Sequence, residues 1–207
     1  MKRAFFGFIG LLAINFYCHA QQEIYSVGDR GPAGGIIFFD KGIFSDGWRY
    51  LEVAPPETEF ESQWGPGGVK VNVITNPDGS LKDFEFEAVG YFYIFGTGLT
   101  IGSGKRNTQL IIEQSRVQGE NGHAAQTCIN MKYNGFADWF MPSRDEMNIM
   151  YRNLVQSGLV SFNNKSYWSS SQSSGVGHAW SHSFKDGSYV EETPKQLTFW
   201  VRAIRAF

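Results

Sequence analysis

The chain has 207 residues, of which 42% are hydrophobic and 18% are charged, and its formal net charge is −2 at pH 7. This composition is sufficient for one sizeable core and excludes long disordered acidic or basic tails. Glycine contributes 24 residues and aromatic side chains 16% of the chain, without the sustained three-residue glycine period of collagen. We therefore expect short strands joined by many tight turns.

Residues 1–20 have the pattern of a secretory signal peptide. Two basic residues precede an apolar run over 4–17, and the small residues Cys18 and Ala20 mark a cleavage site. The run is too short to span a membrane, and no later apolar stretch reaches the required length, so we expect no transmembrane span. The mature chain, 21–207, is expected to be secreted, periplasmic or at the cell surface. The alternative is a lipoprotein anchored through Cys18.

Charge and cysteine content narrow the function of the mature chain. Cleavage removes two basic residues and no acidic one, so the net charge falls from −2 to −4. Nucleic-acid binding favours a basic face, so we expect no nucleic-acid partner. Cys128 is the one cysteine left, which excludes an internal disulfide bond. We expect it to be a small buried hydrophobic residue on a helix, with the alternative of a catalytic pair with His123.

The first half of the mature chain begins with a predicted β-hairpin. Its strands are Ile36–Phe39 and Trp48–Val53, and Ser45-Asp46-Gly47 supplies the turn between them. Residues 55–104 follow as a glycine- and aromatic-rich, insertion-like segment of a single domain. Alternating and apolar patterns predict strands within this segment at 69–74 and 83–88. The run 89–95 is aromatic and apolar throughout, and we expect it to be covered from solvent.

Helices are predicted over 105–158 and strands after that. The first helix is expected to be capped at Asn107 or Thr108 and to reach Arg116. The second covers 124–133, and the third begins with a capping box of Ser143 and Glu146. Strands follow at 167–171, 179–184, 189–191 and 198–206. The order of strands, helices and strands predicts an α+β fold in which N- and C-terminal strands pair.

Motifs for phosphate, metal and nucleophile chemistry are weak. The glycine-rich run ending at Lys105 lacks the glycine and hydroxyl spacing of a phosphate-binding loop. His178 and His182 lie in a strand-like stretch, where four residues span about 13 Å, too far for one metal ion. We expect both histidines to be exposed polar residues beside a turn. No metal site and no cofactor are predicted.

Six tryptophans are present, and most are expected in the core. Trp180 is the exception, because it lies between two histidines in a glycine- and serine-rich hairpin. Exposed aromatic rings beside polar groups stack on sugar rings or anchor protein partners. The hairpin therefore predicts a binding surface that contains His178, Trp180, His182, Lys185, Asp186 and Tyr189.

Several motifs resemble those of the Lcl C-terminal domain family, a set of bacterial secreted and surface domains. They are Trp139-Phe140-Met141-Pro142-Ser143 with Glu146-Met147, then Tyr167-Trp168-Ser169-Ser170, then Trp180 with Phe184-Lys185-Asp186-Gly187, and the ending Val201–Phe207. The opening, Tyr25–Asp40, is also similar to a subset of the family. The resemblance covers about 24–54 and 100–207 and implies a C-type-lectin-like α+β fold. The calcium motifs of C-type lectins and the paired cysteines of formylglycine-generating oxidases are absent, so neither chemistry is implied.

These observations lead to one expected function and two alternatives. We expect a non-enzymatic, extracytoplasmic binding module that recognises a glycan or a surface protein. The first alternative is a structural envelope protein without a small ligand, which docks through Val89–Phe95. The second is an uncharacterised enzyme, which would need a convergent cluster of polar residues in a pocket.

Overall fold

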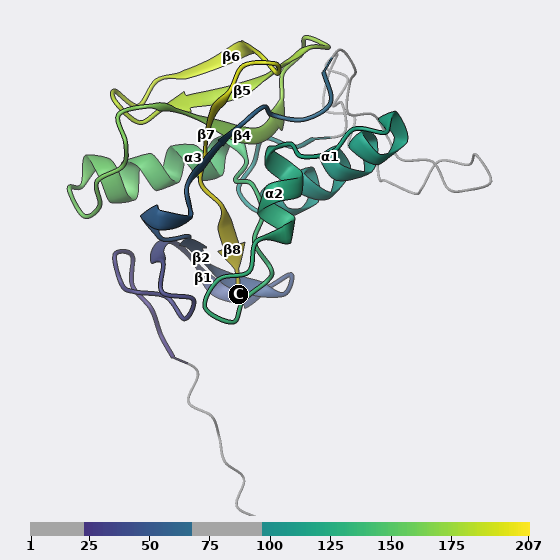
Figure 1. Cartoon of the computed structure of the whole chain (residues 1–207). Coiled ribbons are helices and arrows are strands. Elements are labelled where there is room, and N and C mark those ends of the chain that lie inside the picture. The colour runs from purple at the N-terminus through teal and green to yellow at the C-terminus, as the bar shows by residue number, and fades with distance from the viewer. Residues whose placement is uncertain (1–22, 68–96) are drawn as a thin grey trace, which may run out of the picture.

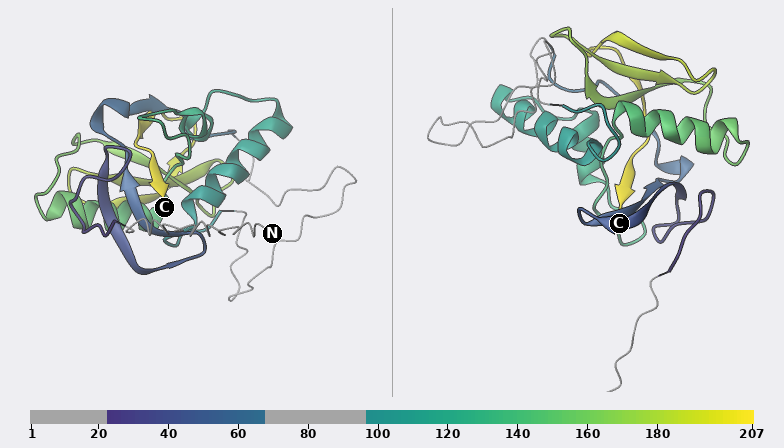
Figure 2. Two further views of the ribbon diagram at one scale, coloured as in Figure 1. Left: turned by 90° about the horizontal axis from the view of Figure 1, so that it is seen from below. Right: turned by 180° about the vertical axis from the view of Figure 1, so that it is seen from behind.

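The computed structural model describes residues 23–67 and 97–207. The predicted signal peptide, the strands expected at 69–74 and 83–88, and the apolar run expected to be covered at 89–95 lie outside the described residues. The described part is an α+β fold, as predicted, with two sheets at opposite ends of the molecule (Figure 1). Figure 2 shows the same arrangement from below and from behind, with helices flanking the region between the sheets.

The smaller sheet has the strand order β1-β2-β8, formed by β1 (Ile36–Ser45), β2 (Trp48–Val53) and β8 (Ile204–Ala206). The predicted hairpin is confirmed, because Ser45 pairs with Trp48 and both Asp46 and Gly47 have positive φ. Such a two-residue turn matches the twist of antiparallel strands. The predicted pairing of N- and C-terminal strands is also confirmed by the antiparallel β2–β8 ladder.

The larger sheet has five strands in the order β3-β7-β4-β5-β6. They are β3 (Phe60–Ser62), β7 (Phe199–Val201), β4 (Ser166–Gln172), β5 (His178–Ser183) and β6 (Tyr189–Pro194). The β4–β7 pair is parallel and the other pairs are antiparallel. A 3₁₀-helix, η1 (Pro56–Thr58), precedes the edge strand β3.

The strand predicted over 198–206 is wrong as one element, because the chain leaves the larger sheet after Val201 and joins the smaller sheet at Ile204. Arg202 and Ala203 lie in the break. The Arg202 side chain is buried against the Ala54 carbonyl and the Glu59 carboxylate. The Ala203 carbonyl accepts from Ala54 N–H. These contacts with residues far away in the sequence divide an otherwise continuous strand pattern.

The helices are α1 (Gly104–Gln118), α2 (Ala124–Asn130) and α3 (Arg144–Met150), and α3 continues as a π-helix, η2 (Tyr151–Gln156). The predicted caps of α1 are wrong, since this helix starts after Ser103. The Asn107 side chain instead makes two hydrogen bonds to the Gly98 backbone, both 2.7 Å. Helix α2 ends three residues before the predicted Tyr133, because Met131 adopts an extended conformation.

The capping box of α3 is confirmed. The Ser143 hydroxyl accepts from the Glu146 backbone N–H, and the Glu146 carboxylate accepts from the Ser143 backbone N–H at 2.6 Å. After η2 the chain turns at Gly158, which has a φ of 75° and ends the helical segment as predicted. Glycine tolerates this left-handed conformation without steric cost.

The core consists of two clusters of buried side chains. Trp64, Trp139 and Trp168, all fully buried, pack with the inner faces of α1 and α2. The second cluster lies where α3 and η2 meet both sheets, and it contains Phe38, Phe140, Met150, Leu154, Tyr167 and Phe184. Three of the six tryptophans are thus fully buried. Across residues 23–67 and 97–207, no helix is both long and apolar enough to cross a membrane.

Candidate functional site

The β5–β6 hairpin presents one face to the helical segment formed by α3 and η2. Alternate residues of a strand point to the same face, so His178, Trp180 and His182 share it. Tyr189 of β6 pairs with His182 in the register and lies 5.9 Å from it between ring centroids. The Tyr151 ring of η2 lies 5.5 Å from the His182 ring. Figure 1 shows this hairpin above α3.

Trp180 contacts both an aromatic ring and a cation. Its ring centroid is 5.8 Å from that of Tyr189, and the Arg144 guanidinium carbon is 5.0 Å from its centroid. Arg144 also pairs with Asp145, with 2.8 Å between Nε and Oδ1. Trp180 is half-buried and Tyr189 is 50% exposed. We call these four residues (Arg144, Asp145, Trp180 and Tyr189) the Trp180 surface.

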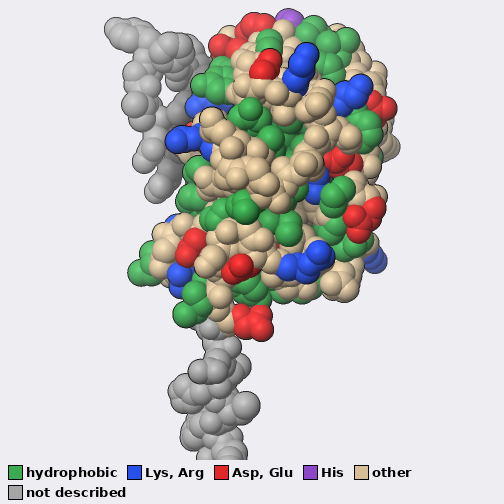
Figure 3. Space-filling model, turned by 90° about the vertical axis from the view of Figure 1, so that its left-hand side faces the viewer, with side chains coloured by type: hydrophobic (Ala, Val, Ile, Leu, Met, Phe, Trp, Pro, Cys, Tyr) green, Lys and Arg blue, Asp and Glu red, His purple; other side chains and the backbone are tan. Residues whose placement is uncertain are grey.

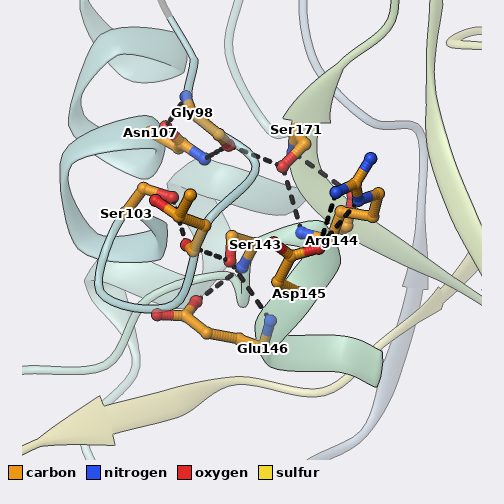
Figure 4. Close-up of polar contacts among 10 residues, drawn as sticks. Gly98, Ser103, Asn107, Ser143, Arg144, Asp145, Glu146 and Ser171 are labelled. Atoms are coloured by element: carbon orange, nitrogen blue, oxygen red, sulfur yellow. Dashed lines mark hydrogen bonds and ion pairs between the residues drawn. The ribbon is translucent and has the colours of Figure 1, made fainter. Parts of the chain in front are cut away.

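Backbone hydrogen bonds hold the start of α3 in place next to β4 and the loop before α1 (Figure 4). The Arg144 N–H donates to Ser171 Oγ at 3.0 Å, and this hydroxyl donates to the Gly98 carbonyl at 2.8 Å. The Asp145 N–H donates to the Leu99 carbonyl at 3.0 Å. The backbone of both charged residues is therefore fixed by two separate segments of the chain, β4 and the loop before α1.

Glu146 connects the start of α3 to the loop before α1 from inside. Its carboxylate accepts from the backbone N–H group of Ser143 at 2.6 Å (Figure 4) and from that of Gly102 at 2.8 Å. The side chain is completely buried, and this burial raises the pKa of Glu146 to about 7 despite the hydrogen bonds, which act in the opposite direction. The cap of the helix that carries Arg144 thus depends on a carboxyl group that titrates near neutral pH.

This elevated pKa predicts a pH-dependent stability that a Glu146→Gln variant lacks. Because the pKa is raised in the folded state, the stabilisation from Glu146 is full below its ordinary pKa of 4.5 and declines as the pH rises to about 7. The expected decline is about 3 kcal/mol relative to the variant. Urea unfolding of both proteins between pH 4.5 and 8.5 measures it, and a constant difference in unfolding free energy would contradict the assignment. Glutamine also fits a capping box.

The two predicted site histidines, His178 and His182, differ in how far they are exposed. The prediction that both are exposed is wrong for His182, which is only 1% exposed beneath Tyr151, Phe184 and Tyr189. Neither of its ring nitrogens has a hydrogen-bond partner among the described residues. Burial lowers the pKa of His182 to about 4, so the ring is neutral at pH 7. His178 is half-buried, with Nδ1 3.4 Å from a Glu192 carboxylate oxygen.

The remaining predicted site residues, Lys185 and Asp186, lie in the exposed turn between β5 and β6. The Asp186 carboxylate accepts from the Ser188 hydroxyl and backbone N–H, at 2.7 and 3.0 Å. These two hydrogen bonds lower the pKa of Asp186 to about 2. Asp186 therefore organises the turn, while the structure brings Trp180 and Tyr189 together on the hairpin face.

Arg144 and Asp145 are the two residues of the surface that the sequence reasoning missed. The capping box at Ser143 places both in the first turn of α3, but nothing local indicates that this turn meets a hairpin more than 30 residues later. A sequence signal existed only in the resemblance, because the Pro142-Ser143 motif and Trp180 are both part of it.

The residues of the alternative catalytic pair, Cys128 and His123, each have other surroundings in the structure. Cys128 is fully buried, as predicted, and burial raises the pKa of its thiol. His123 instead contacts Glu120, with 3.0 Å between Nε2 and the carboxylate oxygen. No group of three or more histidine, cysteine or acidic residues suited to a metal ion occurs in this part of the chain.

Comparison with known proteins reveals only distant similarity. No family model and no curated protein matches the chain, so the resemblance to the Lcl C-terminal domain family stays a prediction. Among solved structures, the chain is similar to a fimbrial protein from Bacteroides ovatus ATCC 8483, with a TM-score of 0.49 and 13% identity. The match covers 77% of this chain and 36% of that protein, so this chain spans little more than a third of its length.

Proposed function

We propose that this chain is a non-enzymatic, extracytoplasmic binding module that recognises glycans through the Trp180 surface. The observation that carries the proposal is that two accessible aromatic rings, Trp180 and Tyr189, lie beside an ion pair. The Arg144 guanidinium carbon of this pair is 5.0 Å from the Trp180 ring centroid. Aromatic faces contact the C–H groups of a sugar ring, while charged side chains provide hydrogen bonds to its hydroxyl groups. The extracytoplasmic location rests on the signal-peptide pattern, and the C-type-lectin-like fold rests on the family resemblance.

The hairpin is a suitable position for such a site. It is held from below by α3 and η2 and from the side by β4, so the binding residues lie on regular elements instead of a long loop. Side chains held on rigid elements lose less conformational freedom when a ligand binds. His182 contributes indirectly in this proposal, because its ring supports the accessible Tyr189 from beneath.

Replacement of Trp180 by alanine tests the location of the site. Screening the full secreted chain on a glycan array, with and without calcium, should identify bound glycans, and Trp180→Ala should weaken their binding by at least about tenfold, equivalent to about 1.4 kcal/mol. The matched control is Trp48→Ala in the other sheet. Trp48 is also half-buried and also contacts a cation, with Lys41 Nζ 3.9 Å from its ring centroid.

Two results would contradict the proposal in different ways. Equal loss of binding in both tryptophan variants, with equal loss of thermal stability, would indicate general destabilisation and not a binding site. Absence of glycan binding by the unmodified chain, with or without calcium, would favour the alternatives of a protein partner or a structural envelope role.

A further inference from the structure

The ion pair of the Trp180 surface leaves one donor group and one acceptor atom available. Arg144 Nε and Nη2 both lie 2.8 Å from the same oxygen, Asp145 Oδ1. Within residues 23–67 and 97–207, Arg144 Nη1 and Asp145 Oδ2 make no hydrogen bond. The two side chains are 26% and 32% exposed, so a ligand in solution can reach them. One short stretch of surface therefore presents a cationic N–H donor beside an anionic acceptor.

This donor and acceptor are held in position before any ligand arrives. The backbone N–H of Arg144 donates to Ser171 Oγ (Figure 4), and that of Asp145 donates to the Leu99 carbonyl. The guanidinium is further restricted by Trp180 on one side and by the carboxylate on another. Preorganised polar groups of this kind increase affinity because little side-chain entropy remains to be lost on binding.

Charge indicates which ligands suit the pair. The guanidinium and carboxylate neutralise each other, and the other charged residues of the β5–β6 hairpin, Lys185, Asp186, Glu191 and Glu192, add a net negative charge that disfavours an anionic ligand. Figure 3 shows basic and acidic side chains interspersed over the side of the molecule that it presents. A charged ligand would be attracted by one member of the ion pair and repelled by the other, whereas a neutral ligand can use both as hydrogen-bond partners.

We propose, on the basis of the function proposed above, that Arg144 and Asp145 recognise two adjacent hydroxyl groups of a neutral hexose. A hydroxyl group both donates and accepts hydrogen bonds. One hydroxyl accepts from Arg144 Nη1, and its neighbour donates to Asp145 Oδ2. The adjacent Trp180 and Tyr189 rings contact the apolar face of the same sugar. The ligand class is therefore a neutral glycan with a free pair of adjacent hydroxyls, and uronates and other acidic sugars are disfavoured.

The Asp145→Asn variant separates neutral from acidic ligands by the direction of its effect. The array should carry neutral hexose glycans, the same glycans with one of the adjacent hydroxyls methylated, and uronate glycans. We expect the wild-type chain to bind the unmethylated neutral glycans and Asp145→Asn to bind them at least tenfold more weakly. Arg144→Gln should have a similar effect. Asp46→Asn, the same change at an exposed residue of the β1–β2 turn, is the matched control.

The outcomes distinguish this inference from the function on which it rests. If uronates bind and Asp145→Asn strengthens that binding, the ligand is acidic and the inference is wrong, while a glycan-binding role stands. If methylated and unmethylated neutral glycans bind equally, the adjacent hydroxyls are not recognised. If no glycan binds the wild type, the proposed function itself fails. Thermal unfolding of each variant shows whether the start of α3 remains intact.

Discussion

Replacement of Arg205 by methionine is expected to lower the free energy of unfolding by about 3–5 kcal/mol, the largest effect we anticipate for a charged residue. Arg205 lies in the C-terminal strand β8 and is almost completely buried. It contacts Glu52 at 3.2 Å through Nη1 and Asp138 at 2.9 and 3.0 Å through Nε and Nη2. Without the guanidinium, the fully buried Glu52 carboxylate loses its cation.

The effect of losing the Arg205–Glu52 ion pair can be separated from the effect of losing packing. Methionine retains much of the apolar contact that the arginine stem makes, and the Arg205 guanidinium also lies 4.1 Å from the Phe136 ring centroid. Adding Glu52→Gln to the methionine variant removes the unpaired charge and should recover part of the lost stability. Urea unfolding followed by tryptophan fluorescence measures all three proteins. If the methionine variant lost less than about 1 kcal/mol of unfolding free energy, the prediction would be wrong, and water would have to solvate the Glu52 carboxylate in place of the guanidinium.

Replacement of Gly35 by alanine is the second prediction, with an expected loss of about 3 kcal/mol or more. A Cβ atom at this position would lie 2.0 Å from the Val53 carbonyl oxygen, an impossible distance. The neighbouring strand β2 cannot move away easily, because it pairs with β1 on one side and β8 on the other. The Gly35 N–H also donates to Glu52 Oε1 at 2.7 Å, so a backbone shift weakens the same buried network.

Gly177→Ala serves as the comparison for this variant. No atom lies within 4 Å of the Cβ that would be added at Gly177, so this change should alter the unfolding free energy by less than about 0.5 kcal/mol. Thermal and urea unfolding of both variants test the prediction together. Similar stabilities for the two alanine variants would contradict the close approach of Gly35 to β2.

The two predictions concern one structural unit. The glycine-rich turn before β1 folds around Glu52, whose carboxylate accepts from the Ala33 and Gly35 N–H groups. Arg205 reaches the same carboxylate from β8, near the C-terminus. The sequence motifs at the two ends of the mature chain, which the family resemblance singled out, are thus linked through a buried ion pair. Their role in this structure is stability, while the proposed binding surface lies at the opposite sheet.

Half of the proposed surface could be found without the structure. Trp180 and Tyr189 attract attention because large aromatic residues occur among glycines, serines and charges, where a core role is unusual. Arg144 and Asp145 did not, since an acidic residue in the first turn of a helix has a sufficient local explanation in the helix dipole, and an arginine beside it is by itself no sign of a binding surface. Their proximity to Trp180 arises from packing of α3 against β5, which no local pattern describes.

The sequence by itself determined the features that depend on neighbouring residues: the capping box of Ser143 and Glu146, the Asp46-Gly47 turn and the alternation of the strands. Tertiary structure alone decided which ionisable residues are buried, where the strand at 198–206 divides, and which surface the helix start shares with the hairpin. The reason is physical. A cap or turn satisfies hydrogen bonds within a few residues, whereas a buried charge such as Glu52 or a neutral His182 is stable only where distant segments supply an ion-pair partner or an aromatic enclosure.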